Sequence, residues 1–192
     1  MPANRRPAVV LIVLTQLSSF ALGPIAIAQD KKPVAASDGA APLITGGRIE
    51  LNLAGAELIL QVARQKATAL GVKVNIAVVD NGGHLLAFNR MDGARPASGY
   101  TALTKATSAA TFRQESGSLP AGGEANLLLS LGVPAAAGAS GGKITTLKGG
   151  VPILVEGQVI GAVGVGGASG EQDAEVAKAG IQALLSALPT KS

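Results

Sequence analysis

Residues 72–92, VKVNIAVVDNGGHLLAFNRMD, constrain the fold more than any other stretch of the chain. Residues 74–79 are rich in β-branched side chains, and residues 85–88 form a second apolar run. Between the two runs stands DNGG, whose residues tolerate the positive φ of a tight turn. The segment therefore predicts a β-hairpin. Because its first strand is apolar on both faces, we expect the hairpin to lie centrally in a sheet that is covered on both sides.

Composition limits what can pack around this hairpin. The 192 residues suffice for one domain of ordinary size and a leader, and 47% of them are apolar. Only 2% are aromatic, so the core must be built from aliphatic side chains and alanine. The chain has no cysteine, which excludes disulfides, thiolate metal sites and cysteine nucleophiles.

The formal charge of +4 does not come from a basic surface. Part of the excess lies in the terminal segments, at Arg5, Arg6, Lys31, Lys32 and Lys191, while residues 47–189 hold nearly equal numbers of basic and acidic residues. A phosphate-binding face needs clustered cations, and stacked bases need aromatic side chains. The sequence has neither pattern, so we predict no nucleic-acid partner.

Residues 1–28 have the pattern of a secretory signal peptide. Arg5 and Arg6 precede an apolar run at residues 8–22, and AIA at residues 26–28 forms a cleavage signal. We predict cleavage after Ala28 and a secreted or periplasmic protein, with an uncleaved membrane anchor as the alternative. Residues 29–46 lack apolar periodicity and predict a flexible linker, so the folded domain is expected at residues 47–190.

The rest of the chain alternates between helical and strand patterns. Helices are predicted from Asn52 to Gly71, from a cap at Ser98 to residue 112, briefly at residues 124–131, and from a capping box at Ser169 and Gln172 to Pro189. Three further strands are predicted at residues 144–147, 151–155 and 159–165, after a small-residue loop at residues 134–142. This order predicts an α+β fold, with a mostly antiparallel five-stranded sheet flanked by helices.

Two glycine-rich stretches match catalytic or phosphate-binding motifs only in part. GASGG at residues 138–142 fits G-x-S-x-G, but no strand precedes it and the only histidine lies upstream. GAVGVGGASG at residues 161–170 lacks a dinucleotide-binding register, and acidic residues follow it. We interpret the second stretch as close packing of a strand against a helix or a neighbouring subunit, with backbone amides facing a ligand as the alternative.

The candidate chemistry gathers at the hairpin and the second helix. His84 is the only histidine, and a metal held by a macrocycle needs only one or two axial ligands from the protein. The alternative is an ordinary residue at the junction of turn and strand. The second helix carries hydroxyls at Thr101, Thr104, Ser108 and Thr111, beside Lys105 and Arg113. This stripe is either a solvated or subunit-facing side, or a pocket wall whose cations face acidic ligand groups.

Four segments, in this order, resemble one known family. They are IAVVDNGGHLLAFNRMDGA at residues 76–94, TKATSAATF at 104–112, GGVPILVEGQVIGAVGVGG at 149–167 and SGEQDAEVAKAGI at 169–181. Together they resemble the GlcG/HbpS-like family of haem-binding or haem-degrading domains, which is related to the C-terminal domain of PduO-type proteins. The resemblance covers about residues 49–188.

The resemblance implies a profilin-like α+β sandwich that forms homo-oligomers, often octamers. It also implies haem as the cofactor and, for one secreted type, a membrane sensor kinase as a partner. In haem-binding relatives a helix threonine or a histidine meets the iron, which points to His84 or Thr107 as the metal ligand. Carried onto this sequence, the implied haem-binding residues are His84, Arg95, Thr104, Lys105, Thr107, Ser108, Thr111 and Arg113, with Arg95, Lys105 or Arg113 pairing with the propionates.

We therefore predict a secreted or periplasmic haem-binding protein, and storage, sensing and degradation of haem stay open as its role. The alternative is a module that binds a small organic acid without haem, or an oligomeric partner protein. An enzyme with only the fold of its relatives ranks third, because the chain is short of histidine, cysteine and paired carboxylates. The sequence assigns no catalytic residue.

Overall fold

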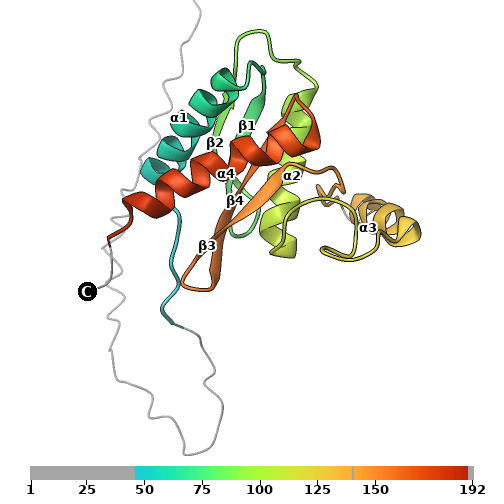
Figure 1. The fold of residues 1–192 in the computed structure, drawn as a ribbon. Coiled ribbons are helices and arrows are strands. Elements are labelled where there is room, and N and C mark those ends of the chain that lie inside the picture. The colour runs from blue at the N-terminus through green and yellow to red at the C-terminus, as the bar shows by residue number, and fades with distance from the viewer. Residues whose placement is uncertain (1–45, 140, 190–192) are drawn as a thin grey trace, which may run out of the picture. The chain divides into compact units, whose positions relative to one another are not determined.

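Four strands form one antiparallel sheet at the centre of the fold (Figure 1). The structure is a computed structural model that describes residues 46–139 and 141–189. The sheet has the order β2-β1-β4-β3, and all its neighbouring strands are antiparallel. The strands are β1 (Asn75–Asp80), β2 (Leu85–Arg90), β3 (Gly150–Val155) and β4 (Gln158–Gly166). The predicted α+β class and the antiparallel pairing are therefore confirmed.

The prediction of a fifth strand at residues 144–147 is wrong, because side chains take its backbone groups. The Thr145 N–H donates to the Ser108 hydroxyl at 2.8 Å, and the Leu147 carbonyl accepts from the Ser116 hydroxyl at 2.7 Å. A segment bound in this way has no free ladder of donors and acceptors to offer β3. The predicted hairpin exists, but only β1 lies inside the sheet, while β2 is an edge strand.

Two long helices cover one face of the sheet. They are α1 (Leu53–Ala69) and α4 (Gly170–Ala187), and α4 crosses in front of the strands in Figure 1. Asn52 caps α1 by accepting the Gly55 N–H at 2.9 Å, and Ser169 with Gln172 forms the predicted capping box of α4. The aliphatic core lies between these helices and the sheet. Its largest fully buried side chains are Ile59, Ile76, Ile153, Val74, Val78, Val163, Val165 and Val176.

A single helix, α2 (Ser98–Phe112), covers the opposite face, and only small residues separate it from the strands. Its buried side chains include the four predicted alanines, Ala102, Ala106, Ala109 and Ala110. A Cβ on Gly164 of β4 would overlap the Ala102 carbonyl oxygen and the Ala106 nitrogen, and one on Gly150 of β3 would overlap the Lys105 carbonyl oxygen. The predicted close packing of the glycine-rich strand against a helix is therefore confirmed.

Two predicted helix boundaries are wrong. Ala97, which has no side-chain capping bond, occupies the N-cap of α2, and Ser98 is the first helical residue. The predicted loop at residues 134–142 is largely helical, because α3 (Leu127–Ala139) continues through Pro134. Asn126 supports its start by accepting the Leu129 N–H at 3.0 Å. None of the α3 residues is buried, and no described helix is long and apolar enough to cross a membrane.

Candidate functional site

The turn between β1 and β2 is held by Asp80 and exposes His84. Asp80 Oδ1 accepts the N–H groups of Gly82 at 2.8 Å and His84 at 2.9 Å, while Gly83 takes a φ of 83°. Asp80 Oδ2 lies 3.2 Å from Nδ1 of the imidazole, whose side chain is 82% exposed. Nε2 has no hydrogen-bond partner among the described residues. A carboxylate that orients one ring nitrogen and leaves the other free is typical of metal-binding histidines.

The Asp80 carboxylate stays ionised well below neutral pH. Partial burial raises its pKa, but the N–H groups of His84 and Gly82, and the His84 ring, lower it by more. The net result is a pKa below the ordinary value of 3.8. The acceptor that orients the imidazole is therefore present throughout the neutral range.

Two of the predicted helix threonines lie against this turn. The Thr107 hydroxyl donates to the Gly83 carbonyl at 3.1 Å, and a Cβ on Gly83 would lie 2.8 Å from the Thr107 methyl. The Thr111 methyl would lie 3.3 Å from the same point, and its hydroxyl donates to the Thr107 carbonyl at 2.7 Å. The structure thus brings the His84 turn, Thr107 and Thr111 together.

Three other predicted residues of the helix region do not join the turn. The Thr104 hydroxyl donates to the Tyr100 carbonyl at 3.0 Å. Ser108 is buried and donates to the Thr104 carbonyl while accepting from residue 145, so it anchors the loop before β3. Arg113 takes the left-handed position after α2 with a φ of 58° and lines none of the cavities described here.

An apolar cavity of about 340 Å³ runs between β2 and the first half of α2, and we call it the β2–α2 groove. Three of its large apolar side chains stay exposed, with Leu85 at 51%, Phe88 at 42% and Tyr100 at 80%. Leu85 follows His84 directly in the chain. Exposed apolar side chains that line a cavity indicate a ligand or partner surface. The full lining is Asn75, Leu85, Phe88, Arg90, Pro96, Gly99, Tyr100 and Leu103.

The groove has two polar residues that sequence reasoning missed, Asn75 and Arg90. Asn75 is fully buried at its base and donates through Nδ2 to the Arg95 carbonyl at 3.0 Å. Its Oδ1 is the one buried side-chain acceptor without a partner in the described part of the chain. Arg90 pairs with Asn75 across the two strands and places a cation in the lining. The spacing of Arg90 two residues after Phe88 in β2, which puts both on one face of the strand, is the signal that could have identified Arg90.

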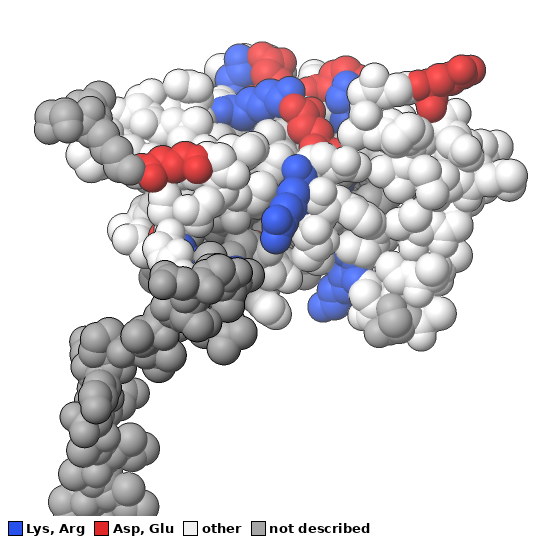
Figure 2. Space-filling model, turned by 90° about the horizontal axis from the view of Figure 1, so that it is seen from below, with Lys and Arg blue, Asp and Glu red and all other residues white. Residues whose placement is uncertain are grey.

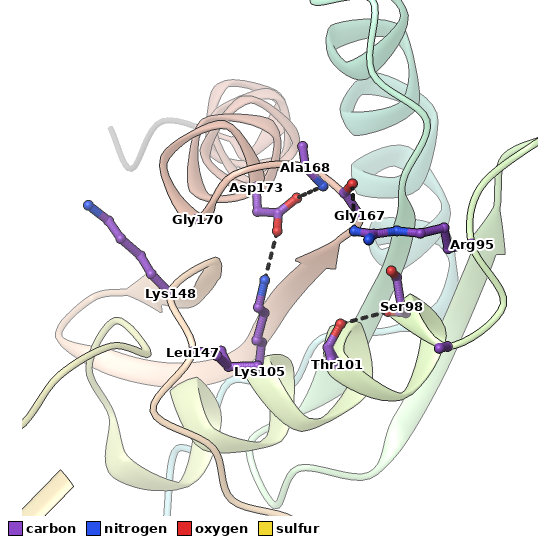
Figure 3. Close-up of a pocket in the computed structure, with 11 residues that line it drawn as sticks. Arg95, Ser98, Thr101, Lys105, Leu147, Lys148, Gly167, Ala168, Gly170 and Asp173 are labelled. Atoms are coloured by element: carbon purple, nitrogen blue, oxygen red, sulfur yellow. Dashed lines mark hydrogen bonds and ion pairs between the residues drawn. The ribbon is translucent and has the colours of Figure 1, made fainter.

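A second cavity of about 440 Å³ lies between the N-terminal ends of α2 and α4, and we call it the α2–α4 pocket (Figure 3). It contains two predicted residues, Arg95 and Lys105. Lys105 is buried, and its ammonium contacts Asp173 Oδ2 at 2.7 Å and the Val165 carbonyl at 2.8 Å. Sequence reasoning missed Asp173 as this partner, although the spacing of Lys105 from Ala102 and Ala109 places it on the buried face of α2.

Asp173 uses both of its oxygens inside the protein. While Oδ2 pairs with Lys105, Oδ1 accepts the Ala168 N–H at 3.1 Å and so fixes the turn into α4. Arg95 crosses the other end of the pocket and donates to the Gly167 carbonyl at 3.2 Å (Figure 3). The residues described contain no group of three or more His, Cys, Asp or Glu side chains that could hold a bare metal ion.

A family model described as "Haem degrading protein HbpS-like" matches residues 51–182. The chain is 41% identical over 110 residues to Protein GlcG of Escherichia coli K12, an alignment that covers 57% of this chain and 76% of GlcG.

Solved structures of related proteins share this fold. A double mutant of HbpS from Streptomyces reticuli has a TM-score of 0.60 and 30% identity, over 78% of this chain and 97% of that one. A complex of PduOC with haem has a TM-score of 0.57 and 25% identity, over 70% of this chain and 95% of that one.

Proposed function

Because this chain belongs to the HbpS-like family of haem-degrading proteins, we propose that it binds haem in the β2–α2 groove, with His84 or Thr107 as the iron ligand. The observation that carries the proposal is the exposed imidazole of His84. It is oriented by Asp80, and His84 directly precedes Leu85, which lines the apolar groove. The family and the haem complex of the related PduOC support the ligand class.

The residues present fit an iron porphyrin better than a bare ion. A porphyrin supplies four equatorial nitrogens, so the protein needs to provide only one or two axial donors. The groove provides apolar contact through Leu85, Phe88 and Tyr100, and Arg90 is a cation suited to a propionate carboxylate. Bound haem would supply a redox-active iron, while the protein binds and orients the macrocycle and controls the access of water to it.

This assignment changes which cation faces the propionates. Arg95 and Lys105, which the sequence suggested, line the α2–α4 pocket instead, and Lys105 is engaged by Asp173. Arg90 is the basic residue that lines the groove itself. Replacing Arg90 with Gln should therefore weaken haem binding more than replacing Arg95 with Gln.

The test is a titration of the purified protein with ferric haem, followed at the Soret band. The proposal predicts a saturable, shifted band that changes in position or is lost in His84→Ala or in Thr107→Val. Thr107→Val keeps the methyl that packs on Gly83 while removing the hydroxyl. Thr68→Val is the control, since it also removes a helix threonine hydroxyl, but one that donates within its own helix, to the Arg64 carbonyl at 3.0 Å, and not to the turn. A Soret band identical to that of free haem in the wild-type protein would sink the proposal.

We also propose that the protein self-associates. A groove of about 340 Å³ is smaller than a whole porphyrin, so a second copy would complete the cover. The helix α3 supports association because Leu127, Leu128 and Leu131 are 70%, 83% and 62% exposed. Light scattering should give an oligomer for the wild type and a smaller species for Leu128→Glu. A monomer at high micromolar concentration would contradict this.

The export of the protein is a further part of the proposal. It rests on Arg5, Arg6, the apolar run and the AIA signal, all of which lie outside the described residues. Mass spectrometry of protein from the periplasm or medium should find Gln29 at the N-terminus. A full-length cytoplasmic product that begins at Met1 would contradict the proposal.

A further inference from the structure

The α2–α4 pocket collects three cations from separate segments. Figure 3 shows Arg95 at one end, Lys148 at the other, and the Lys105–Asp173 pair between them. Arg95 precedes α2, Lys148 precedes β3, and Lys105 lies in the middle of α2. Residues 47–189 as a whole hold nearly equal numbers of basic and acidic residues, and both kinds lie side by side along the upper edge of the face in Figure 2. The pocket is therefore a local site and not part of a general basic field.

The pocket is lined by Ser98, whose hydroxyl is accessible from the cavity and not fully buried. Ser98 is only 7% exposed, lines the cavity, and its Oγ has no hydrogen-bond partner among the described residues. A hydroxyl in a cavity wall that no protein group engages can bond a ligand or water. The neighbouring Thr101 donates its hydroxyl proton to the Ser98 carbonyl at 3.0 Å, which leaves the Thr101 oxygen free to accept. These two residues offer a ligand both a donor and an acceptor.

The cations keep hydrogen-bond donors for a ligand. The Lys105 ammonium has three N–H donors, and two of them are used by Asp173 and Val165. The Arg95 guanidinium has five donors, of which the structure commits one, to Gly167. α2 begins at Ser98 with an N-cap, Ala97, that offers no side-chain bond, so the positive end of its dipole also faces this region.

The charge balance selects the type of anion. Lys105 is paired with Asp173, and Lys148 is paired with Glu171 at 3.2 Å. The pKa of Glu171 is lowered by its own backbone N–H and by Lys148, so this carboxylate is ionised at neutral pH. Arg95 is then the cation of the pocket that no carboxylate neutralises among the described residues, and a single negative charge balances it. A phosphate dianion would add a second charge close to Asp173 and Glu171.

We propose that the α2–α4 pocket binds the carboxylate of a small organic monocarboxylic acid, through Arg95, Ser98 and the remaining donor of Lys105. The volume of about 440 Å³ leaves room for a carbon skeleton against Leu147, Ala97 and Ala168. This site is separate from the β2–α2 groove. Ser98, Thr101 and Lys105 form one stripe of α2, and Gly99, Tyr100 and Leu103 form another.

The experiment is a ¹H–¹⁵N NMR titration of the purified, haem-free protein with propionate, lactate, benzoate and phosphate. Saturable shifts should appear at the amides of Ser98, Thr101 and Ala168 with at least one monocarboxylate, in about the millimolar range of Kd. Phosphate, titrated at a pH where the dianion predominates, should bind at least about tenfold more weakly, because its second negative charge is repelled by the nearby carboxylates.

Variants localise the binding and separate it from haem. Arg95→Gln should raise the Kd at least about tenfold, the loss expected for a charge-assisted pair, and Ser98→Ala several-fold. Lys178→Gln is a control, since it removes one lysine from a surface ion pair outside the pocket, and it should leave the Kd unchanged. His84→Ala should also leave it unchanged, so loss of haem binding and loss of acid binding are told apart.

Three results would overturn the proposal. The first is the absence of saturable shifts with any of the three acids. The second is binding that Arg95→Gln and Ser98→Ala both leave intact, because the ligand would then lie elsewhere. The third is phosphate binding as tight as that of the best acid at the same amides, which would contradict the charge balance.

Discussion

The two faces of the sheet are packed by different means. Between the sheet and α1 with α4, branched aliphatic side chains such as Ile59 and Ile153 fill the space and supply apolar area. Between the sheet and α2, alanines and glycines let the helix backbone lie directly on the strands. A Cβ on Gly166 would lie 2.6 Å from the Ser98 carbonyl oxygen, so even the start of α2 touches β4.

This difference explains where the candidate sites lie. On the aliphatic face two helices cover the sheet and leave a cavity only at its edge, between α1 and the end of β2, whereas on the opposite face one helix cannot cover the full width of a four-stranded sheet. The β2–α2 groove and the α2–α4 pocket are the spaces left along the two sides of α2. The close contact holds α2 in place between them. We therefore expect the free energy of unfolding to fall when a side chain is enlarged on the α2 face. On the face covered by α1 and α4, we expect it to fall when a side chain is shortened.

The largest effect is expected from one added methyl group on the α2 face. Gly164→Ala would drive a Cβ into the Ala102 carbonyl and to 2.9 Å from the Ala106 Cα, which are backbone atoms that cannot rotate away. We predict a loss of more than about 4 kcal/mol in the free energy of unfolding, or failure to fold. Gly117→Ala is the control, since its Cβ would meet nothing within 4 Å. Equal urea midpoints for Gly164→Ala and Gly117→Ala would contradict the claim that α2 packs directly on the strand backbone.

The buried ion pair on the same side of the sheet should give the next largest effect. Lys105→Met leaves the Asp173 carboxylate buried and uncompensated, and we predict a loss of about 3–5 kcal/mol. Adding Asp173→Asn removes that charge while its oxygen can still accept from Ala168, so the double variant should regain much of the loss. Urea unfolding of both variants measures this. A double variant no more stable than the single one would show that the pair matters through packing and not through charge.

On the face covered by α1 and α4, the loss in the free energy of unfolding should grow with the side-chain volume that is removed. Ile153 is fully buried in that core, so we predict a cost of about 2–5 kcal/mol for Ile153→Ala and about 0.5–1.5 kcal/mol for Ile153→Val. The same denaturation series provides the measurement. The comparison would be sharpened if Gly164→Ala, which adds one carbon, costs more than Ile153→Ala, which removes three.

The smallest effect is expected at the exposed turn, and it should depend on pH. Because the pKa of Asp80 is lowered by folding, the ionised carboxylate stabilises the protein above its ordinary pKa of 3.8, and this contribution is lost as the pH falls through the lower, folded pKa. Asp80→Asn should therefore cost less than about 1 kcal/mol at pH 7, since the side chain is partly exposed. The gap between the variant and the wild type should close below about pH 3.8. A stability difference that grows as the pH falls below this value would contradict the prediction that the ionised Asp80 carboxylate stabilises the folded protein.

The sequence predicted those features that depend on near neighbours in the chain. The hairpin turn with Asp80, the capping box at Ser169 and the alanine face of α2 each involve spacings of a few residues, and the structure confirms them. The α+β class follows from the order of such elements. Glycines such as Gly164, which lie in a predicted strand and not in a turn, also indicated close packing of that strand against a helix.

The remainder depends on contacts between distant segments. Lys105 and Asp173 are 68 positions apart, and nothing local pairs them. The loop at residues 144–147 has a strand-like pattern, yet it is held by Ser108 and Ser116, which no periodicity reveals. The groove requires the register of β1 with β2, which places Arg90 opposite Asn75. Because of these long-range contacts, the predicted binding residues do not form one site. They lie in two cavities and on the surface of α2.

The most direct test of the proposed function is a crystal structure of the protein with ferric haem. We predict the porphyrin against Leu85, Phe88 and Tyr100, with the iron bound by His84 or Thr107 and with Arg90 near a propionate. A porphyrin bound away from the β2–α2 groove, or in contact with neither His84 nor Thr107, would contradict the account.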